Sequence, residues 1–246
     1  KDLYRMARWS KGGTQSQTYT PTLKRNDTGA FAVTPEEKAE ALRRSFFPRP
    51  PEADTSDILA YRYLPALPDH PIQAHETQQA LDNMAPNKAP GPDELPARIL
   101  RLLGAELVAP ATRLFNAALE QGYCPRHFRQ STTIALRKPG KDDYQEPKWY
   151  RPIALLNTLG MVMESIIATR LSYLAETHKL LPENHLGGRK LNSPEHAVHL
   201  LTSRIQTAVG QGQVASPLLL DVAGAFDNVP WPRLLHNMRN DAYRVQ

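Results

Sequence analysis

A short apolar run in the last part of the chain leads directly into a single acid. Residues 218–220 are all leucine, and Asp221 follows them. A strand over residues 214–221 would carry this carboxylate at its end, where side chains that face a ligand emerge. A buried carboxylate is costly unless it is paired, and a divalent cation is one such partner. The alternative is that Asp221 only caps a turn, and the acid alone does not separate the two interpretations.

A second group with possible chemistry is a basic cluster in the middle of the chain. Residues 131–136 and 150–156 are rich in β-formers, so they are predicted to pair as a hairpin. Cations around its tip would neutralise phosphate charge, because Arg makes two-point contacts and Lys acts as a point charge. A solvated surface turn is the alternative. The cations are Arg137, Lys138, Lys141, Lys148 and Arg151.

Composition limits the classes of protein that fit. The formal net charge of the 246 residues is +5. The basic excess lies in residues 1–25, with six Lys/Arg against one acid, and in residues 126–151, with seven against three. Such local excess is typical of a polyanion binder. The single cysteine, Cys124, excludes an internal disulfide and fits a reducing intracellular compartment, where we expect it in the core. No apolar run approaches the roughly 20 residues of a membrane span, so no membrane partner is expected.

The elements that would position these groups are mostly helices. Thr34 followed by Pro35 and Glu37 predicts a capped helix start. Periodicity predicts helices over residues 35–47, 75–84, 96–103, 105–121, 157–176, 193–209 and 234–240. With the hairpin, this indicates an α+β fold. The predicted domains are a basic arm or linker over 1–33, a helix and Pro-rich linker over 34–74, and a main domain over 75–246.

Five blocks, taken in order, resemble reverse transcriptases of non-LTR (LINE-like) retrotransposons. Residues 34–74 resemble the linker that follows the endonuclease domain in such elements, most like fungal copies. The resemblance covers roughly residues 80–240. It implies reverse-transcriptase-like fingers, built of helices plus a β-hairpin, that run into a truncated palm. In an intact parent, it implies RNA-directed DNA polymerisation by two-metal nucleotidyl transfer. The blocks are residues 88–93 with Pro96-Ala97, 136–141, 150–156, Gly188-Arg189 and 220–229.

The resemblance implies roles at the catalytic end of the site. Asp221 would be catalytic and would bind Mg²⁺ (or Mn²⁺) together with the backbone carbonyl of Val222. Arg151 would hold the triphosphate of the incoming dNTP with either Lys138 or Lys141, and the resemblance does not choose between these two lysines.

It also implies roles in selecting substrates. Phe226 would be the aromatic gate that selects dNTPs over ribonucleotides. Lys88, Arg137 and Arg189 would contact the RNA template. A DNA primer and a nuclear location are implied as well.

The chain departs from this family pattern after Asp221. The family carries a second acidic site, a Tyr/Phe-x-Asp-Asp turn, whereas the Asp-Asp pair of this chain, Asp142-Asp143, lies in the hairpin tip. The sequence begins at Lys1 rather than Met. We therefore expect part of a longer polymerase, inactive as a fragment. The alternatives are a non-catalytic RNA-binding module and a degenerate retroelement relic, whose strand 214–221 would lack neighbours and promote aggregation.

Overall fold

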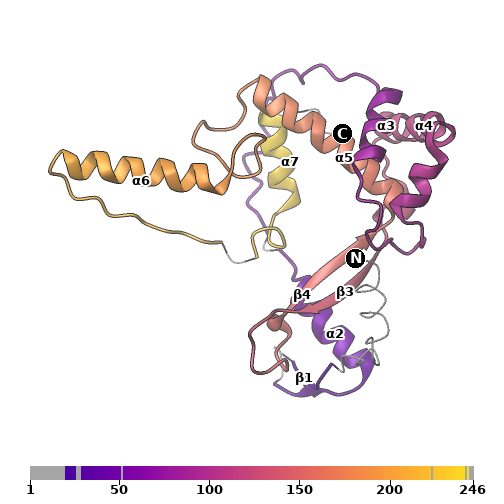
Figure 1. The fold of residues 1–246 in the computed structure, drawn as a ribbon, viewed down its shortest axis with the longest axis horizontal. Helices are drawn as coiled ribbons and strands as arrows, with labels where there is room; N and C mark the ends of the chain where they lie inside the picture. The colour runs from indigo at the N-terminus through magenta and orange to yellow at the C-terminus, as the bar shows by residue number, and fades with distance from the viewer. Residues whose placement is uncertain (1–19, 26–28, 51, 223, 242, 244–246) are drawn as a thin grey trace, which may run out of the picture. The chain divides into compact units, whose positions relative to one another are not determined.

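The computed structural model combines helices with two small sheets (Figure 1) and describes residues 20–25, 29–50, 52–222, 224–241 and 243. This agrees with the predicted α+β class. Contacts divide the described residues into two units. One contains those of Lys1–Arg49 with Thr133–Ala154, and the other contains those of Pro50–Thr132 with Leu155–Gln246. The domain boundaries predicted at residues 33 and 74 stay a prediction.

In the first unit, helix α2 spans Pro35–Phe46 and begins as the sequence predicts. The Glu37 N–H donates to Thr34 Oγ1, and the Thr34 N–H donates back to the Glu37 carboxylate, each at 3.2 Å. Two strands precede it, because β1 (Leu23–Lys24) pairs antiparallel with β2 (Phe31–Ala32). These two strands lie within the stretch over residues 1–33 that was predicted to be a basic arm or linker, and that domain assignment stays a prediction. Leu23 and Ala32 are fully buried. Their burial could not be predicted from the sequence, because the residues around them are mostly polar.

The predicted hairpin is confirmed as strands β3 (Ser131–Arg137) and β4 (Tyr150–Leu156), which form a two-stranded sheet. The loop between them contains a short 3-10 helix, η2 (Pro147–Trp149). Tyr150 anchors this loop, since its hydroxyl donates to the Tyr144 carbonyl at 2.9 Å. The buried members of the core of this unit are Leu23, Ala32, Ala41, Phe46 and Tyr150.

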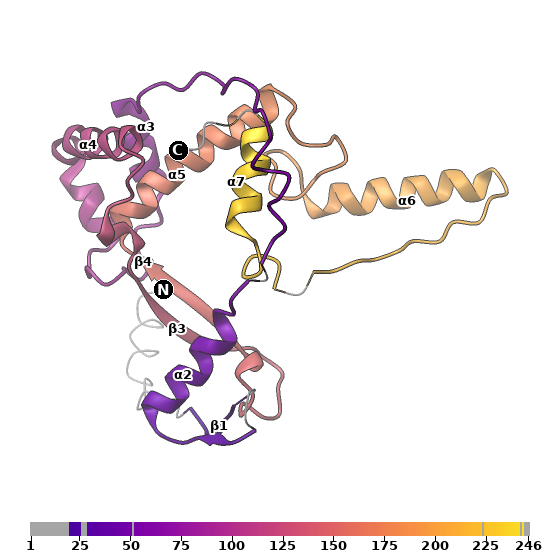
Figure 2. The same ribbon diagram turned by 180° about the vertical axis from the view of Figure 1, so that it is seen from behind.

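Three helices form the core of the second unit, namely α3 (Ala74–Asn83), α4 (Ala97–Glu120) and α5 (Thr158–Thr177). Both ribbon views show α3 against α4 and α5 (Figures 1 and 2), and α3 packs on both. Gly104 interrupts α4 with the non-helical angles φ 48° and ψ −130°, so the two predicted helices over 96–103 and 105–121 are confirmed as the segments on either side of this glycine. Buried apolar side chains fill the interface, among them Leu81, Leu100, Val108, Phe115, Val162 and Ile166.

The last part of the chain carries the main correction to the predicted fold. Helix α6 (Pro194–Gly210) is present as predicted but buries none of its residues, and α7 (Trp231–Asn240) follows later. The strand predicted over 214–221 is wrong, because these residues form no strand, and Leu218, Leu219 and Leu220 are 81%, 85% and 84% exposed. A strand needs a hydrogen-bonded neighbour, and no described strand pairs with this segment.

Two smaller expectations can also be checked. Cys124 is exposed rather than in the core, because it lies in the loop that follows α4. A search of the described residues finds no helix long and apolar enough to cross a membrane.

Candidate nucleotide and nucleic-acid site

The segment around Asp221 presents its side chains to solvent. Asp221 is exposed, and its Oδ1 accepts a hydrogen bond from the Val222 N–H at 3.0 Å. Gly224 begins a turn with φ 60°, and the Asn228 N–H donates to its carbonyl at 3.0 Å. Phe226 in this turn is 95% exposed. The expected nucleotide gate thus lies in an exposed turn, the expected metal ligand is exposed shortly before it in the sequence, and the roles of both stay predictions.

These residues do not complete a divalent-cation site by themselves. Mg²⁺ prefers near-octahedral oxygen coordination, and Asp221 with the Val222 carbonyl offers one carboxylate and one carbonyl. Within the described ranges, no group of three or more His, Cys, Asp or Glu side chains could hold a metal ion. The buried carboxylate at a strand end that motivated the metal interpretation is absent, because Asp221 is exposed and the strand does not form.

The predicted basic tip is present in the first unit, and it is built around an indole ring. Lys141 Nζ lies 4.3 Å and Lys148 Nζ 4.8 Å from the centroid of the Trp149 ring. Lys138 has a different environment, since its Nζ donates to the Lys148 carbonyl at 2.7 Å. A cation over an aromatic face is held in place without losing its charge. The two lysines that the sequence left equivalent are therefore different in the structure.

Two arginines complete the basic surface of the hairpin. The Arg137 guanidinium lies 4.8 Å from the centroid of the Tyr144 ring. Burial raises the pKa of the nearby Tyr150 hydroxyl, and the hydrogen bond with Arg137 opposes this shift. Arg151 is exposed on β4, and no described carboxylate forms an ion pair with it. The tip therefore offers several cations to a polyanion.

The block of residues 88–93 is a turn that docks on the start of α5. Lys88 is exposed, whereas Gly91 is buried. A Cβ on Gly91 would lie 2.4 Å from the Leu156 carbonyl carbon, which is a steric clash. Glycine has no Cβ, so it is the residue that fits here. The Asp93 N–H donates to Asn157 Oδ1 at 3.1 Å. The packing thus explains the glycine and leaves Lys88 available to a ligand, with its template contact still a prediction.

Sequence reasoning missed the residues that receive this turn. Asn157 is buried, and its Nδ2 donates to the His127 carbonyl at 2.8 Å. The buried Thr158 donates from Oγ1 to the Leu95 carbonyl at 2.6 Å. Polar residues at a helix start suggest a capping role, but their true partners lie far away in sequence.

Arg189, the third cation expected near the template, makes its contacts within the protein. Its Nε and Nη2 contact the Glu176 carboxylate at 2.8 and 2.6 Å, and its Nη1 donates to the carbonyls of Pro182 and His185. The hydrogen bond from Arg189 lowers the pKa of Glu176. Arg189 therefore fastens its own loop to the last turn of α5, and its role in template binding stays a prediction.

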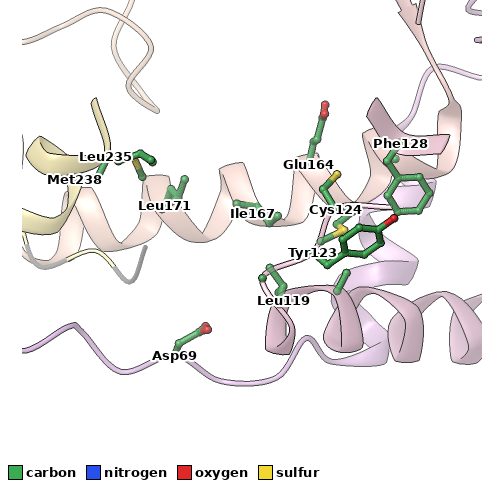
Figure 3. Close-up of a pocket in the computed structure, with 14 residues that line it drawn as sticks. Asp69, Leu119, Tyr123, Cys124, Phe128, Glu164, Ile167, Leu171, Leu235 and Met238 are labelled. Atoms are coloured by element: carbon green, nitrogen blue, oxygen red, sulfur yellow. The ribbon is translucent and has the colours of Figure 1, made fainter. Parts of the chain in front are cut away.

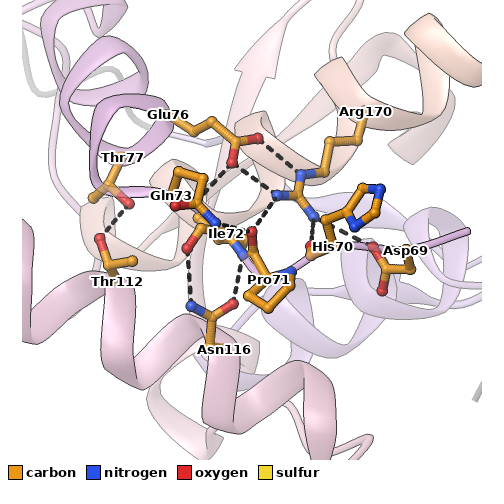
Figure 4. Close-up of polar contacts among 10 residues, drawn as sticks. All are labelled: Asp69, His70, Pro71, Ile72, Gln73, Glu76, Thr77, Thr112, Asn116 and Arg170. Carbon is orange, nitrogen blue, oxygen red and sulfur yellow. Dashed lines mark hydrogen bonds and ion pairs between the residues drawn. The ribbon is translucent and has the colours of Figure 1, made fainter.

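A similar clamp at Arg170 escaped prediction. Its guanidinium contacts both oxygens of Glu76, at 2.8 and 2.7 Å, and donates to the Pro71 carbonyl at 3.1 Å (Figure 4). The Asn116 side chain makes two hydrogen bonds with the backbone of Ile72, the residue after Pro71. It accepts from the Ile72 N–H at 2.6 Å and donates to the Ile72 carbonyl at 2.9 Å. The end of the Pro-rich linker is thus fixed to α4 and α5.

An apolar hollow of about 360 Å³ also lies in the second unit (Figure 3). Leu119, Ile167, Leu171 and Leu235 line it together with two carboxylates, Asp69 and Glu164. Burial raises the pKa of Glu164. An apolar lining with two acids does not suit a phosphate, so this hollow is no part of a nucleotide site.

Known proteins with similar sequences now give these sites a context. The RNA-directed DNA polymerase from mobile element jockey of Drosophila funebris is 29% identical over 216 residues, covering 88% of this chain and 23% of that protein. The probable RNA-directed DNA polymerases from transposon BS and transposon X-element of Drosophila melanogaster are each 30% identical over 176 residues, covering 72% of this chain and 19% of theirs. The chain is a homologue of RNA-directed DNA polymerases of mobile elements.

This polymerase homologue spans only 19% to 23% of the length of those three relatives. No family model matches it. The three relatives come from flies, so the expected likeness to fungal copies is not supported.

Proposed function

We propose that this chain is the fingers and the start of the palm of a reverse transcriptase from a non-LTR retrotransposon. The observation that carries the proposal is similarity to the jockey polymerase over 88% of the chain. The helices with a basic β-hairpin, as expected for reverse-transcriptase-like fingers, support it. The polymerase activity, and the nuclear location that it implies, belong to the proposal.

The surfaces have distinct roles in this proposal. The cations of the hairpin tip neutralise the triphosphate of a dNTP, because phosphate is best held by several charge-assisted hydrogen bonds. Lys88 and Arg137 face the RNA template, and Phe226 selects the sugar. Asp221 supplies one acidic ligand to the metal of the intact polymerase, where a divalent ion neutralises charge on the reacting phosphates.

The described residues do not fit a complete metal site, so we expect this chain to bind RNA without extending a primer. The test is a primer-extension assay with purified protein, an RNA template, a DNA primer, dNTPs and Mg²⁺ or Mn²⁺. RNA binding is measured in parallel at several salt concentrations, since phosphate contacts release counterions and weaken as salt rises. Robust cDNA synthesis would refute the inactivity, and salt-independent RNA binding would refute the basic-tip assignment.

A second candidate function is a non-catalytic RNA-binding module. The exposed Asp221 favours it, since the described residues include no group of three or more His, Cys, Asp or Glu side chains that could hold a metal ion, and such a module requires none. The two candidate functions predict different effects of one substitution in a longer polymerase that contains this segment. Asp221→Ala would abolish cDNA synthesis there if the segment is catalytic, and would leave both synthesis and RNA affinity unchanged if it only binds.

A further inference from the structure

A polar groove of about 670 Å³ lies between α3 and α5 in the second unit. No role has been assigned to it above. Its lining is made chiefly of groups that donate and accept hydrogen bonds, together with one aromatic ring and one amine. They are Gln79, Asn83, Ser165, Ser172, Tyr173 and Lys190.

The acids that line this groove are already neutralised. Glu76 is held at both oxygens by Arg170, as Figure 4 shows, at 2.8 and 2.7 Å. Glu176 is held at both oxygens by Arg189, at 2.8 and 2.6 Å. Lys190 is exposed, and no described carboxylate forms an ion pair with it. The groove therefore carries an uncompensated positive charge.

The remaining groups match the chemistry of a nucleotide. Tyr173 is 67% exposed, so its ring is available for stacking. Bases of single-stranded RNA stack on exposed aromatic side chains, while cations contact the adjacent phosphate. Amide and hydroxyl groups such as those of Asn83 and Ser172 bond to base edges and to the ribose 2′-OH.

We propose that this groove binds one nucleotide of single-stranded RNA, with Tyr173 under the base and Lys190 on a phosphate. The proposal rests on the RNA-binding function proposed above and adds a site outside the hairpin tip. It places an RNA contact at Lys190, directly after Arg189, for which the resemblance implied a contact with the RNA template. A duplex is disfavoured, since its paired bases cannot stack on a protein ring.

The test measures binding of a fluorescent single-stranded RNA 12-mer by anisotropy, using the full 246-residue chain. Tyr173→Ala is expected to weaken affinity about tenfold, the typical loss of one base stack. Lys190→Gln is expected to lower the slope of log affinity against log salt by about 1, the loss of one phosphate contact. Matched controls are Tyr123→Ala and Arg113→Gln, which remove an exposed ring and an exposed cation outside the groove and should leave binding unchanged.

A photochemical experiment gives a readout independent of affinity. The same RNA containing 5-iodouridine is irradiated with the protein, and the crosslinked peptide is identified by mass spectrometry. A crosslink at Tyr173 supports the groove. The absence of any crosslink at Tyr173 while other sites crosslink, or equal competition by duplex RNA, overturns it.

The groove and the proposed function fail in different ways. If both groove variants bind RNA as the parent does while Lys88→Gln weakens RNA binding, the groove is wrong and the RNA-binding function stands. If the parent chain itself shows no salt-dependent RNA binding, both are wrong. Thermal melting of each variant confirms that any loss of binding occurs in folded protein.

Discussion

The side-chain amine of Lys138 donates a hydrogen bond to the backbone carbonyl of Lys148, with 2.7 Å between nitrogen and oxygen. The Lys138 N–H also donates to the Trp149 carbonyl at 2.8 Å, so one residue ties both ends of the loop between β3 and β4. Lys141 differs, because it lies over the Trp149 ring and is exposed. Lys138 therefore shapes the tip, and Lys141 is the lysine available to a triphosphate.

The first prediction separates these two lysines by substitution. Lys141→Gln should weaken dATP binding about tenfold without changing the melting temperature, because it removes a charge-assisted contact from an exposed position. Lys138→Met should lower the free energy of unfolding by about 1 kcal/mol, the usual net contribution of one hydrogen bond. Binding is followed by tryptophan fluorescence, since a ligand that draws Lys141 from Trp149 changes the ring's surroundings.

The control for this prediction is Trp149→Phe, which should abolish the fluorescence change and so assign it to this ring. The opposite pattern would contradict the assignment. It would consist of a loss of dATP affinity in Lys138→Met at an unchanged melting temperature, with Lys141→Gln binding like the parent.

A second prediction concerns the close approach of Gly91 to β4. Gly91→Ala should destabilise the second unit by about 1–3 kcal/mol, the range for overpacking, because the new Cβ would lie 2.4–2.5 Å from backbone atoms of Leu156 and Asn157. Urea unfolding measures the loss. Gly187→Ala is the matched control, since an added Cβ there meets nothing within 4 Å. Equal stability of the two variants would show that the turn does not dock as described.

The comparison of these sites with the sequence shows what local patterns can predict. The capping box at Thr34 depends on residues within one helical turn, and it was predicted from the sequence. The clamp between Arg170 and Glu76 joins residues 94 positions apart, so no local pattern reveals it. The pairing of Arg189 with Glu176 is closer, at 13 positions, but it depends on how the intervening loop folds back.

The same reasoning explains the failure at residues 214–221. Alternation and aliphatic content describe how a segment would behave beside a neighbouring strand, but they do not provide that neighbour. Lys138 and Lys141 show a second limit of prediction from local sequence. Their identity and spacing predicted a basic tip correctly, yet their different environments depend on the positions of Trp149 and of the Lys148 carbonyl.

A third prediction follows from the Arg170 clamp and has a defined pH dependence. The hydrogen bond from Arg170 lowers the pKa of Glu76 below its ordinary value of 4.5. The unfolded chain therefore binds this proton more readily, so the stabilisation is present above pH 4.5 and is lost as pH falls through the lower folded pKa.

Arg170→Met should accordingly lower the free energy of unfolding by about 2–3 kcal/mol at pH 7, because both partners are largely buried and Glu76 would lose its counter-charge. The difference from the parent should shrink when urea unfolding is repeated at pH 3. Arg113→Met, which removes an exposed cation of α4, should have little effect at either pH. A constant difference across this pH range would show that the ion pair with Glu76 is not its source.

The last prediction concerns the exposed leucines before Asp221. Residues 218–220 form an extended apolar segment with no strand beside it among the described residues, and such a segment promotes association between chains. Leu219→Lys should therefore reduce concentration-dependent self-association in sedimentation velocity. It should leave the melting temperature unchanged, since this side chain is 85% exposed and loses no packing.

Gln213→Lys adds the same charge to the same exposed segment without removing an apolar side chain, so it separates apolar contact from charge repulsion. Equal dispersal by both variants would assign the association to net charge, and a large fall in melting temperature of Leu219→Lys would mean that the segment is packed.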